Sequence, residues 1–229
     1  MRVIFSSSSN LPGGCAAVFN CSLFAFPAFA AGECLKYKTV PSLKIKVPAF
    51  SVSVVQPDRP MDLLHGNVVA TFAEEYEIEY GAAKIGDNGA PPETRRGGGW
   101  CIFIEGLAVE MGYTGFVVQI DRRHAPGSCE FDGIIEHEDE HINAHLSVVE
   151  DRQKDIRKAI AAAANNVLPV FVPDEDGIDG AMNDLEAELQ NRPEVKLLRQ
   201  KLAAEMEIRN KKIDMNDRGG RIRGCALLQ

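Results

Sequence analysis

The chain has 229 residues, of which 45% are apolar and 25% are charged, and its formal net charge is −8. This length and apolar content suffice for one hydrophobic core. The negative charge argues against a nucleic-acid partner, because surfaces that bind phosphate are basic. Apart from the N-terminus, no apolar run reaches the length of about 18 residues expected of a membrane span.

Residues 1–30 have the pattern of an export signal. Arg2 is their only charged residue, and the stretch from Cys15 to Phe29 is mostly apolar. Ala28-Phe29-Ala30 has the small-x-small form that signal peptidase accepts, so we expect cleavage after Ala30. The alternative is a buried N-terminal segment or an uncleaved anchor. We therefore expect an exported protein, periplasmic or secreted, without a membrane span once the signal is removed.

The next part of the chain carries β-type patterns. Two short segments, 43–47 and 50–55, are flanked by prolines, which favours edge strands. Residues 67–80 contain glutamates that alternate with tyrosine and isoleucine, a pattern typical of a half-buried strand. Residues 100–110 and 115–121 predict two further strands, which we expect to pair as a hairpin around the four residues between them.

The second half of the chain carries helical patterns. Apolar residues at helical spacing predict a helix that begins near Ser128 or Glu130 and ends at Asn165-Asn166. At 1.5 Å per residue this helix is about 50 Å long. Two more helices are predicted over 181–190 and 193–215.

These elements predict an α+β fold: a small antiparallel sheet followed by a long active-site helix and C-terminal helices. We expect one domain over residues 31–173, completed by the C-terminal helices within 174–215. Residues 216–229 contain two adjacent glycines and several arginines, which predicts a disordered tail.

Four cysteines remain after the expected cleavage site: Cys34, Cys101, Cys129 and Cys225. In an exported chain they indicate disulfides, and three connectivities are open. We favour Cys101–Cys129, because the predicted hairpin returns the chain close to Cys101 just before the short connection to Cys129. Zinc ligation by cysteine is the rival interpretation, but the sequence has no C-x-x-C pair.

The segment His137-Glu138-Asp139-Glu140-His141 is an H-E-x-x-H pattern within the predicted long helix. Helical side chains four apart share a face, with about 5–6 Å between their β-carbons, so two imidazoles can bind one zinc ion. Zinc lowers the pKa of a bound water from about 15.7 to near 7. Glu138 would take the water proton and later deliver it to a leaving amine.

This short pattern also occurs by chance, and a solvated helix face is the alternative. Three features favour a metal site: a predicted strand precedes the helix, the chain is expected to be exported, and Ile134 and Ile142 flank the motif as in a partly buried helix. The sequence therefore predicts zinc at His137 and His141, with Glu138 as the general base.

Two further histidines lie near the motif. His145 is eight residues from His137, about 12 Å along a helix, so both cannot bind one ion. We interpret His145 as an outer-shell or cleft residue. His124 lies between the last predicted strand and the helix, where it could face a cleft and stabilise an oxyanion. A capping or surface role is the alternative for His124.

The order of elements resembles the zincin metallopeptidases, and is most similar to small secreted bacterial zinc-dependent proteases. The resemblance covers about residues 70–165 and includes the strands of 100–120, Cys129, Phe131 and the motif His137–His141. It implies zinc bound by the two histidines, a glutamate base, and a strand edge that aligns an extended peptide substrate.

A catalytic zinc needs a third protein ligand. In gluzincin-type sites this ligand is a glutamate on a later helix. The candidates here are Asp184, Glu186, Glu188 and Glu205. We favour Glu186, because the glutamate in Leu185-Glu186-Ala187 is followed by a small residue, as is common in such helices.

Two functions follow as hypotheses. The first is an exported zinc-dependent peptidase that hydrolyses the peptide bonds of a peptide or protein substrate with metal-activated water. The alternative is a non-catalytic exported envelope protein that uses its long helices as an interaction surface, with a structural metal or none. The peptidase requires His137, His141 and a later carboxylate to converge at an open cleft.

Overall fold

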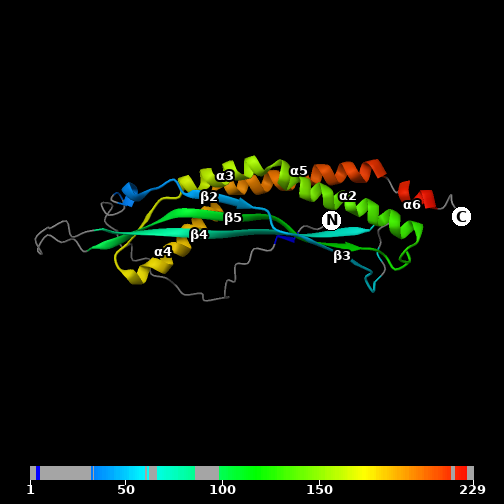
Figure 1. Ribbon diagram of the computed structural model, residues 1–229, viewed down its shortest axis with the longest axis horizontal. Coiled ribbons are helices and arrows are strands. Elements are labelled where there is room, and N and C mark those ends of the chain that lie inside the picture. The colour runs from blue at the N-terminus through cyan, green and yellow to red at the C-terminus, as the bar shows by residue number, and fades with distance from the viewer. Residues whose placement is uncertain are drawn as a thin grey trace, which may run out of the picture.

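The computed structural model describes residues 4–5, 32, 34–59, 61, 66–85, 98–217 and 220–225. A sheet of long strands runs along the longest axis, and three helices, α2, α3 and α5, lie along one of its faces (Figure 1). The expected mixture of strands and helices is confirmed. The strands are β1 (Ile4–Phe5), β2 (Ser42–Lys46), β3 (Ser51–Val55), β4 (Asn67–Ile85), β5 (Gly99–Gln119) and β6 (Val170–Val172). The helices are α2 (Cys129–Asp151), α3 (Gln153–Asn166), α4 (Ile178–Asn191), α5 (Pro193–Asp217) and α6 (Gly220–Cys225), with 3₁₀ turns at Leu35–Tyr37 and Glu175–Gly177.

The centre of the sheet is the antiparallel pair of β4 and β5, which have 19 and 21 residues. On the other edge of β5, β2 and β3 pair with it in parallel and β6 pairs with it antiparallel. β1 pairs with β4 in parallel. The sheet is therefore mixed rather than antiparallel throughout, while the two short strands predicted near the beginning of the chain are confirmed.

The turn predicted between residues 110 and 115 is wrong, because β5 continues through this segment. Met111 and Tyr113 are buried in the core. A β-carbon on Gly112 would lie 2.8 Å from Cδ of Pro48, in the connection between β2 and β3. The glycine thus permits a close approach of two chain segments, which is a known role of glycine within strands.

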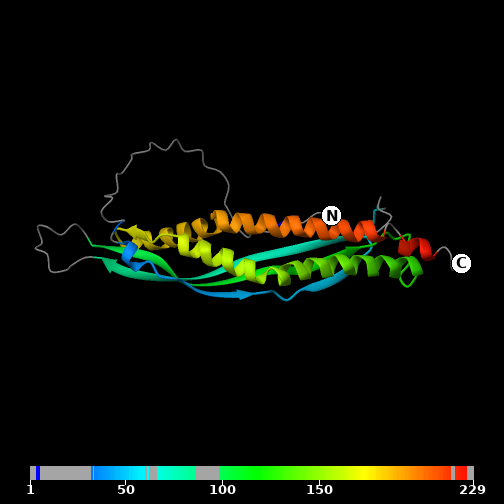
Figure 2. The same ribbon diagram turned by 90° about the horizontal axis from the view of Figure 1, so that it is seen from above.

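The predicted long helix is present as two successive helices, α2 and α3, joined at Arg152. Ser128 caps α2, because its hydroxyl accepts a hydrogen bond from the backbone N–H of Phe131 at 3.2 Å. The two C-terminal helices are confirmed as α4 and α5. Seen from above, α5 runs beside α2 and α3 in the opposite direction (Figure 2).

The hydrophobic core fills the space between the sheet and these helices. From α5 it receives a stripe of buried side chains at helical spacing, Val195, Leu198, Leu202 and Met206. Each fully buried side chain of this size stabilises the fold by about 1.5–3 kcal/mol. The stripe fixes which face of α5 points towards α2, and it therefore positions the polar residues that follow it.

The structure pairs Cys34 with Cys101 and Cys129 with Cys225. The predicted Cys101–Cys129 bond is wrong because β5 is one strand. Cys101 lies at its beginning, and 18 residues of strand separate it from Gln119, about 60 Å at 3.3 Å per residue. A disulfide spans at most about 7 Å between α-carbons. Two disulfides are typical of a protein in an oxidising compartment.

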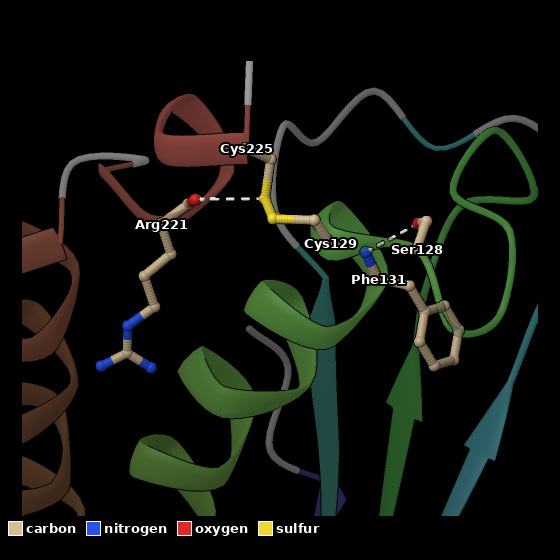
Figure 3. Close-up of a disulfide and its surroundings, with 5 residues drawn as sticks. All are labelled: Ser128, Cys129, Phe131, Arg221 and Cys225. Atoms are coloured by element: carbon tan, nitrogen blue, oxygen red, sulfur yellow. Dashed lines mark hydrogen bonds between the residues drawn. A yellow bond between two sulfur atoms is a disulfide. The ribbon is translucent and has the colours of Figure 1, made fainter. Parts of the chain in front are cut away.

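The disordered tail predicted for residues 216–229 is also corrected. Helix α5 extends to Asp217, and α6 follows it. The bond from Cys225 to Cys129 attaches α6 to the first turn of α2 (Figure 3).

The expected export signal, residues 1–30, lies outside the described residues apart from the two that form β1. Among the described helices, none is both long enough and apolar enough to cross a bilayer.

Candidate metal centre

The face of α2 that points into the molecule carries both histidines of the motif. His137 and His141 expose only 3% and 6% of their surface. Their Nε2 atoms lie 3.2 Å apart, and the rings meet edge to face. Since residues four apart share a helix face, the local sequence alone brings these two nitrogen atoms together.

The third member of the group is Asp214 on α5, which runs alongside. Its Oδ1 atom lies 3.0 Å from Nε2 of His141 and 3.5 Å from Nε2 of His137. Together with the 3.2 Å between the two nitrogens, these distances form a nearly equilateral triangle. Tetrahedral ligands at about 2.0–2.1 Å from an ion are about 3.3–3.4 Å apart. His137, His141 and Asp214, called the metal group below, can therefore hold a metal ion and leave a fourth position open.

The outer nitrogen of each histidine faces a polar side chain of α5. Nδ1 of His141 lies 2.9 Å from Oδ1 of Asn210, and Nδ1 of His137 lies 3.4 Å from Oδ2 of Asp217. The acceptor on Asn210 favours the His141 tautomer with its proton on Nδ1, which leaves Nε2 free to bind a metal. Helix α5 thus orients the His141 ring by a hydrogen bond and places a carboxylate near the His137 ring, in an arrangement that does not form a hydrogen bond.

The α5 residues that contact the histidines share one helical face. Asn210, Asp214 and Asp217 are spaced by four and three residues, which continues the apolar stripe that ends at Met206. Sequence reasoning missed all three. Asp217 fell in the tail that was predicted to be disordered, whereas Asn210 and Asp214 lie in the predicted helix 193–215, whose packing against the histidine helix does not follow from local spacing. The signal that could have found them is the change from apolar to polar residues at unchanged helical spacing.

The predicted third ligand, Glu186, is not part of this group. It lies on α4, where its Oε1 accepts a hydrogen bond from Gln190 at 3.0 Å. It also lies near Tyr80, whose pKa is raised first by burial and then by the negative charge of Glu186. Asp214 occupies the position assigned to Glu186, because α5 packs along α2.

His145 follows His141 by one turn of α2 and lies in the core. It is completely buried against the rings of Tyr113 and Phe116. Among the described residues, neither of its ring nitrogens has a hydrogen-bond partner. Burial lowers its pKa to about 4, which keeps the ring neutral. The expected cleft position is wrong for His145, since it does not line the cavity beside the metal group.

The other predicted cleft histidine, His124, lies in the connection between β5 and α2. Its carbonyl accepts a hydrogen bond of 2.7 Å from the side-chain amide of Gln56. It does not line the cavity either, so the structure gives no support to a role at an oxyanion.

A cleft of about 480 Å³ opens beside the metal group. His137, Glu138, His141 and Asp214 contribute to its polar part. Its apolar wall comes from β4, β5 and α5, through the side chains Val68, Phe72, Tyr113, Leu202, Ala203 and Met206. The candidate metal position therefore adjoins a space large enough for part of a ligand.

Glu138 is the buried acid of this cleft, with 3% of its surface exposed. Its pKa is raised to about 7, chiefly by burial; the charge of His141 opposes this rise and the charge of Asp214 contributes to it. A carboxyl group that titrates near neutral pH can both accept and donate a proton. Gly66 lies close to it, because a β-carbon there would be 3.0 Å from Oε1 of Glu138.

Both basic residues that line the cleft already have acidic partners. Arg199 makes two 2.7 Å bonds to the carboxylate of Glu74. Lys211 lies 2.5 Å from Glu207, one turn earlier on α5. The cleft therefore combines an apolar wall with charges that are largely balanced.

Comparison with protein-family models, with curated proteins and with solved structures finds no match for this chain. The functional assignment therefore depends on the geometry of the metal group, Glu138 and the cleft.

Proposed function

We propose that this protein is an exported zinc-dependent peptidase. The observation that carries the proposal is the triangle formed by Nε2 of His137, Nε2 of His141 and Oδ1 of Asp214, with a buried glutamate beside it in a cleft. Two imidazoles and one carboxylate, with a fourth place for water, are typical of catalytic zinc. A structural zinc site has four protein ligands and is closed, so the open cleft favours catalysis over the envelope-protein alternative.

In the proposed hydrolysis, the zinc ion and the side chains of the protein have separate roles. Zinc, when bound, supplies a water of lowered pKa and polarises the substrate carbonyl. Glu138 accepts the proton of the attacking water and then donates it to the leaving amine, for which a pKa near neutrality is well suited. Asn210 holds the His141 ring in place through Nδ1, and the carboxylate of Asp217 lies 3.4 Å from Nδ1 of His137.

The cleft favours a peptide with an apolar side chain beside the scissile bond. Its wall is formed by aliphatic and aromatic side chains, and its two cations are paired with Glu74 and Glu207. A charged substrate side chain would lose its water there without gaining a free partner, which costs free energy. Burial of an apolar side chain is favourable.

The test uses the protein purified after export, with its disulfides formed. We expect about one zinc ion per chain, and cleavage of an unstructured protein substrate that a chelator abolishes and added zinc restores. Glu138→Gln should abolish cleavage and retain zinc, because glutamine fits the site but cannot accept the proton. Asp139→Asn, at the exposed neighbouring position, is the matched control and should remain active. Unchanged cleavage by Glu138→Gln would refute the assigned role.

A further inference from the structure

The disulfide Cys129–Cys225 lies at the same end of the helix pair as the metal group. Cys129 is the first residue of α2 and precedes His137 by eight residues, while Cys225 ends α6 and follows Asp217 by eight. The bond therefore joins the helix that carries the histidines to the segment that follows Asp214 (Figure 3).

The helix α6 makes further contacts at this end. The guanidinium of Arg221 pairs with Glu140 on α2 and lies 3.8 Å from Asp217 on α5. The backbone of α6 lies close to α2 at Gly133, where an added β-carbon would be 3.4 Å from Cβ of Arg221. Figure 3 shows Arg221 extending from α6 alongside α2. The short helix thus bridges the two long ones beside the metal group.

The end of α5 has little apolar anchorage of its own. The buried apolar stripe of α5 ends at Met206, and beyond it only Asn210 is buried. Ile208 and Met215 expose 68% and 64% of their surface. The side chain of Asp214 is 61% exposed. Helix ends without packed apolar side chains fray, so another restraint must keep Asp214 in place.

We propose that the Cys129–Cys225 disulfide is the restraint that assembles the metal group. It holds α6 against the start of α2, and α6 in turn holds the end of α5, so that Asp214 and Asp217 reach the histidines. Without the bond, the end of α5 separates from α2 and the third ligand is displaced. This inference uses the metal group of the proposed function but not the proposed hydrolysis.

The consequence is a metal centre that forms only after oxidation. Formation of the bond removes two protons and two electrons from the two thiols, and a disulfide donor accepts them by thiol–disulfide exchange. Before that step, in a reducing compartment, the chain binds zinc weakly. The metal group is then completed at the place where the enzyme is to act.

The second disulfide provides a matched control. Cys34–Cys101 closes a segment of 67 residues, compared with 96 for Cys129–Cys225, so removal of either bond releases a similar chain entropy. The 3₁₀ turn that follows Cys34 and the helix α6 lie at opposite ends of the molecule (Figure 1). A general loss of stability would weaken zinc binding after removal of either bond. Loss of the restraint on α5 would weaken zinc binding only after removal of Cys129–Cys225.

The experiment measures zinc affinity by competition with a chromophoric chelator. We expect the double variant Cys129→Ser/Cys225→Ser to bind zinc about 10–100-fold more weakly than the wild type, the range seen when partners of metal ligands are removed. Cys34→Ser/Cys101→Ser should stay within about threefold of the wild type. Serine removes the thiols, so neither variant can bind zinc through thiolates. Equal affinity in the two double variants would overturn the proposal.

A third variant keeps both disulfides and lengthens the connection between α5 and α6. Four glycines inserted directly after Asp217 should weaken zinc binding to the same extent, because α6 then no longer restrains α5. This insertion variant tests the proposal even if Cys129→Ser/Cys225→Ser fails to fold. If it binds zinc as tightly as the wild type, the proposed restraint is overturned. A wild type that binds zinc without hydrolysis refutes only the peptidase. A wild type that binds no zinc refutes both proposals.

Discussion

Nδ1 of His141 and Oδ1 of Asn210 face each other across the interface of α2 and α5, 2.9 Å apart and both buried. A neutral histidine that donates from Nδ1 presents the lone pair of Nε2 to a metal ion, so this one contact determines which nitrogen is available. The histidine comes from a recognisable motif, whereas the asparagine is 69 residues away in the sequence.

Loss of the side-chain oxygen of Asn210 should weaken metal binding, although no metal ligand is removed. We expect Asn210→Leu to lower zinc affinity about 10–100-fold, because the His141 ring loses its orientation and its preferred tautomer. Asn210→Asp retains an oxygen at the same place and should stay close to the wild type. The measurement is zinc titration against a chelator, and equal affinities of the leucine and aspartate variants would contradict the assigned contact.

The identity of the third ligand can be tested with two carboxylates. Asp214→Ala should reduce zinc affinity by at least about 100-fold, because a three-ligand group becomes a two-ligand group. Glu186→Ala is the control, since Glu186 lies on α4 and contacts Gln190. Its zinc affinity should equal that of the wild type. If Glu186→Ala lost zinc affinity and Asp214→Ala kept it, Glu186 would be the third ligand, as predicted from the sequence.

The sequence predicted what depends on local spacing. The pair His137 and His141 and the glutamate between them follow from helical periodicity, as do the two C-terminal helices. Asp214 could not be derived in this way, because its contact with His141 depends on how α5 packs on α2. The polar continuation of the α5 stripe was the available signal.

The errors in the sheet and in the disulfides share one cause. The segment 111–114, which contains Gly112, was predicted to be a turn, but pairing with all of β4 keeps β5 extended through it. A single strand instead of a hairpin moves Cys101 to the far end of the sheet from Cys129. Long-range pairing thus overrode a local turn signal, and the predicted disulfide failed as a direct consequence.

His145 should make stability depend on pH in the acid range. Its pKa is about 4 in the folded chain and about 6.5 when unfolded, so the unfolded chain binds more protons between these values. Stability should fall as pH drops from about 6.5 to about 4, by on the order of 3 kcal/mol. Urea unfolding of the metal-free protein at pH 7.5 and 5 measures the upper part of this fall, about 2 kcal/mol.

His145→Leu has a similar volume and no titrating group, so it should lose much less stability between the two pH values than the wild type. The partly exposed His124→Gln is the control and should keep the wild-type dependence. If the leucine variant loses as much stability as the wild type, other groups, such as His137 and His141, account for the acid sensitivity.

Gly66 should be necessary for the position of Glu138, the proposed general base. A β-carbon there would lie 2.7 Å from Cγ2 of Ile134 and 3.0 Å from Oε1 of Glu138, so Gly66→Ala must displace one of these side chains. We expect a loss of kcat of at least about tenfold, with zinc content unchanged, because a displaced base transfers protons poorly. Gly180→Ala, with open space around its β-carbon, should keep full activity. Full activity of Gly66→Ala would show that Glu138 need not stay where it lies.

The apolar wall of the cleft can be tested by filling it. Ala203 lines the cleft and Ala204, the next residue of α5, does not, although both are exposed. Ala203→Phe should lower kcat/KM for peptides with a large apolar side chain at the cleaved position by about tenfold or more, because the ring takes up the space of that side chain. Peptides with alanine there should be affected less, and zinc affinity should not change. Ala204→Phe adds the same ring outside the cleft and should behave as the wild type. An equal effect of Ala203→Phe on both peptides would mean that the substrate side chain binds elsewhere.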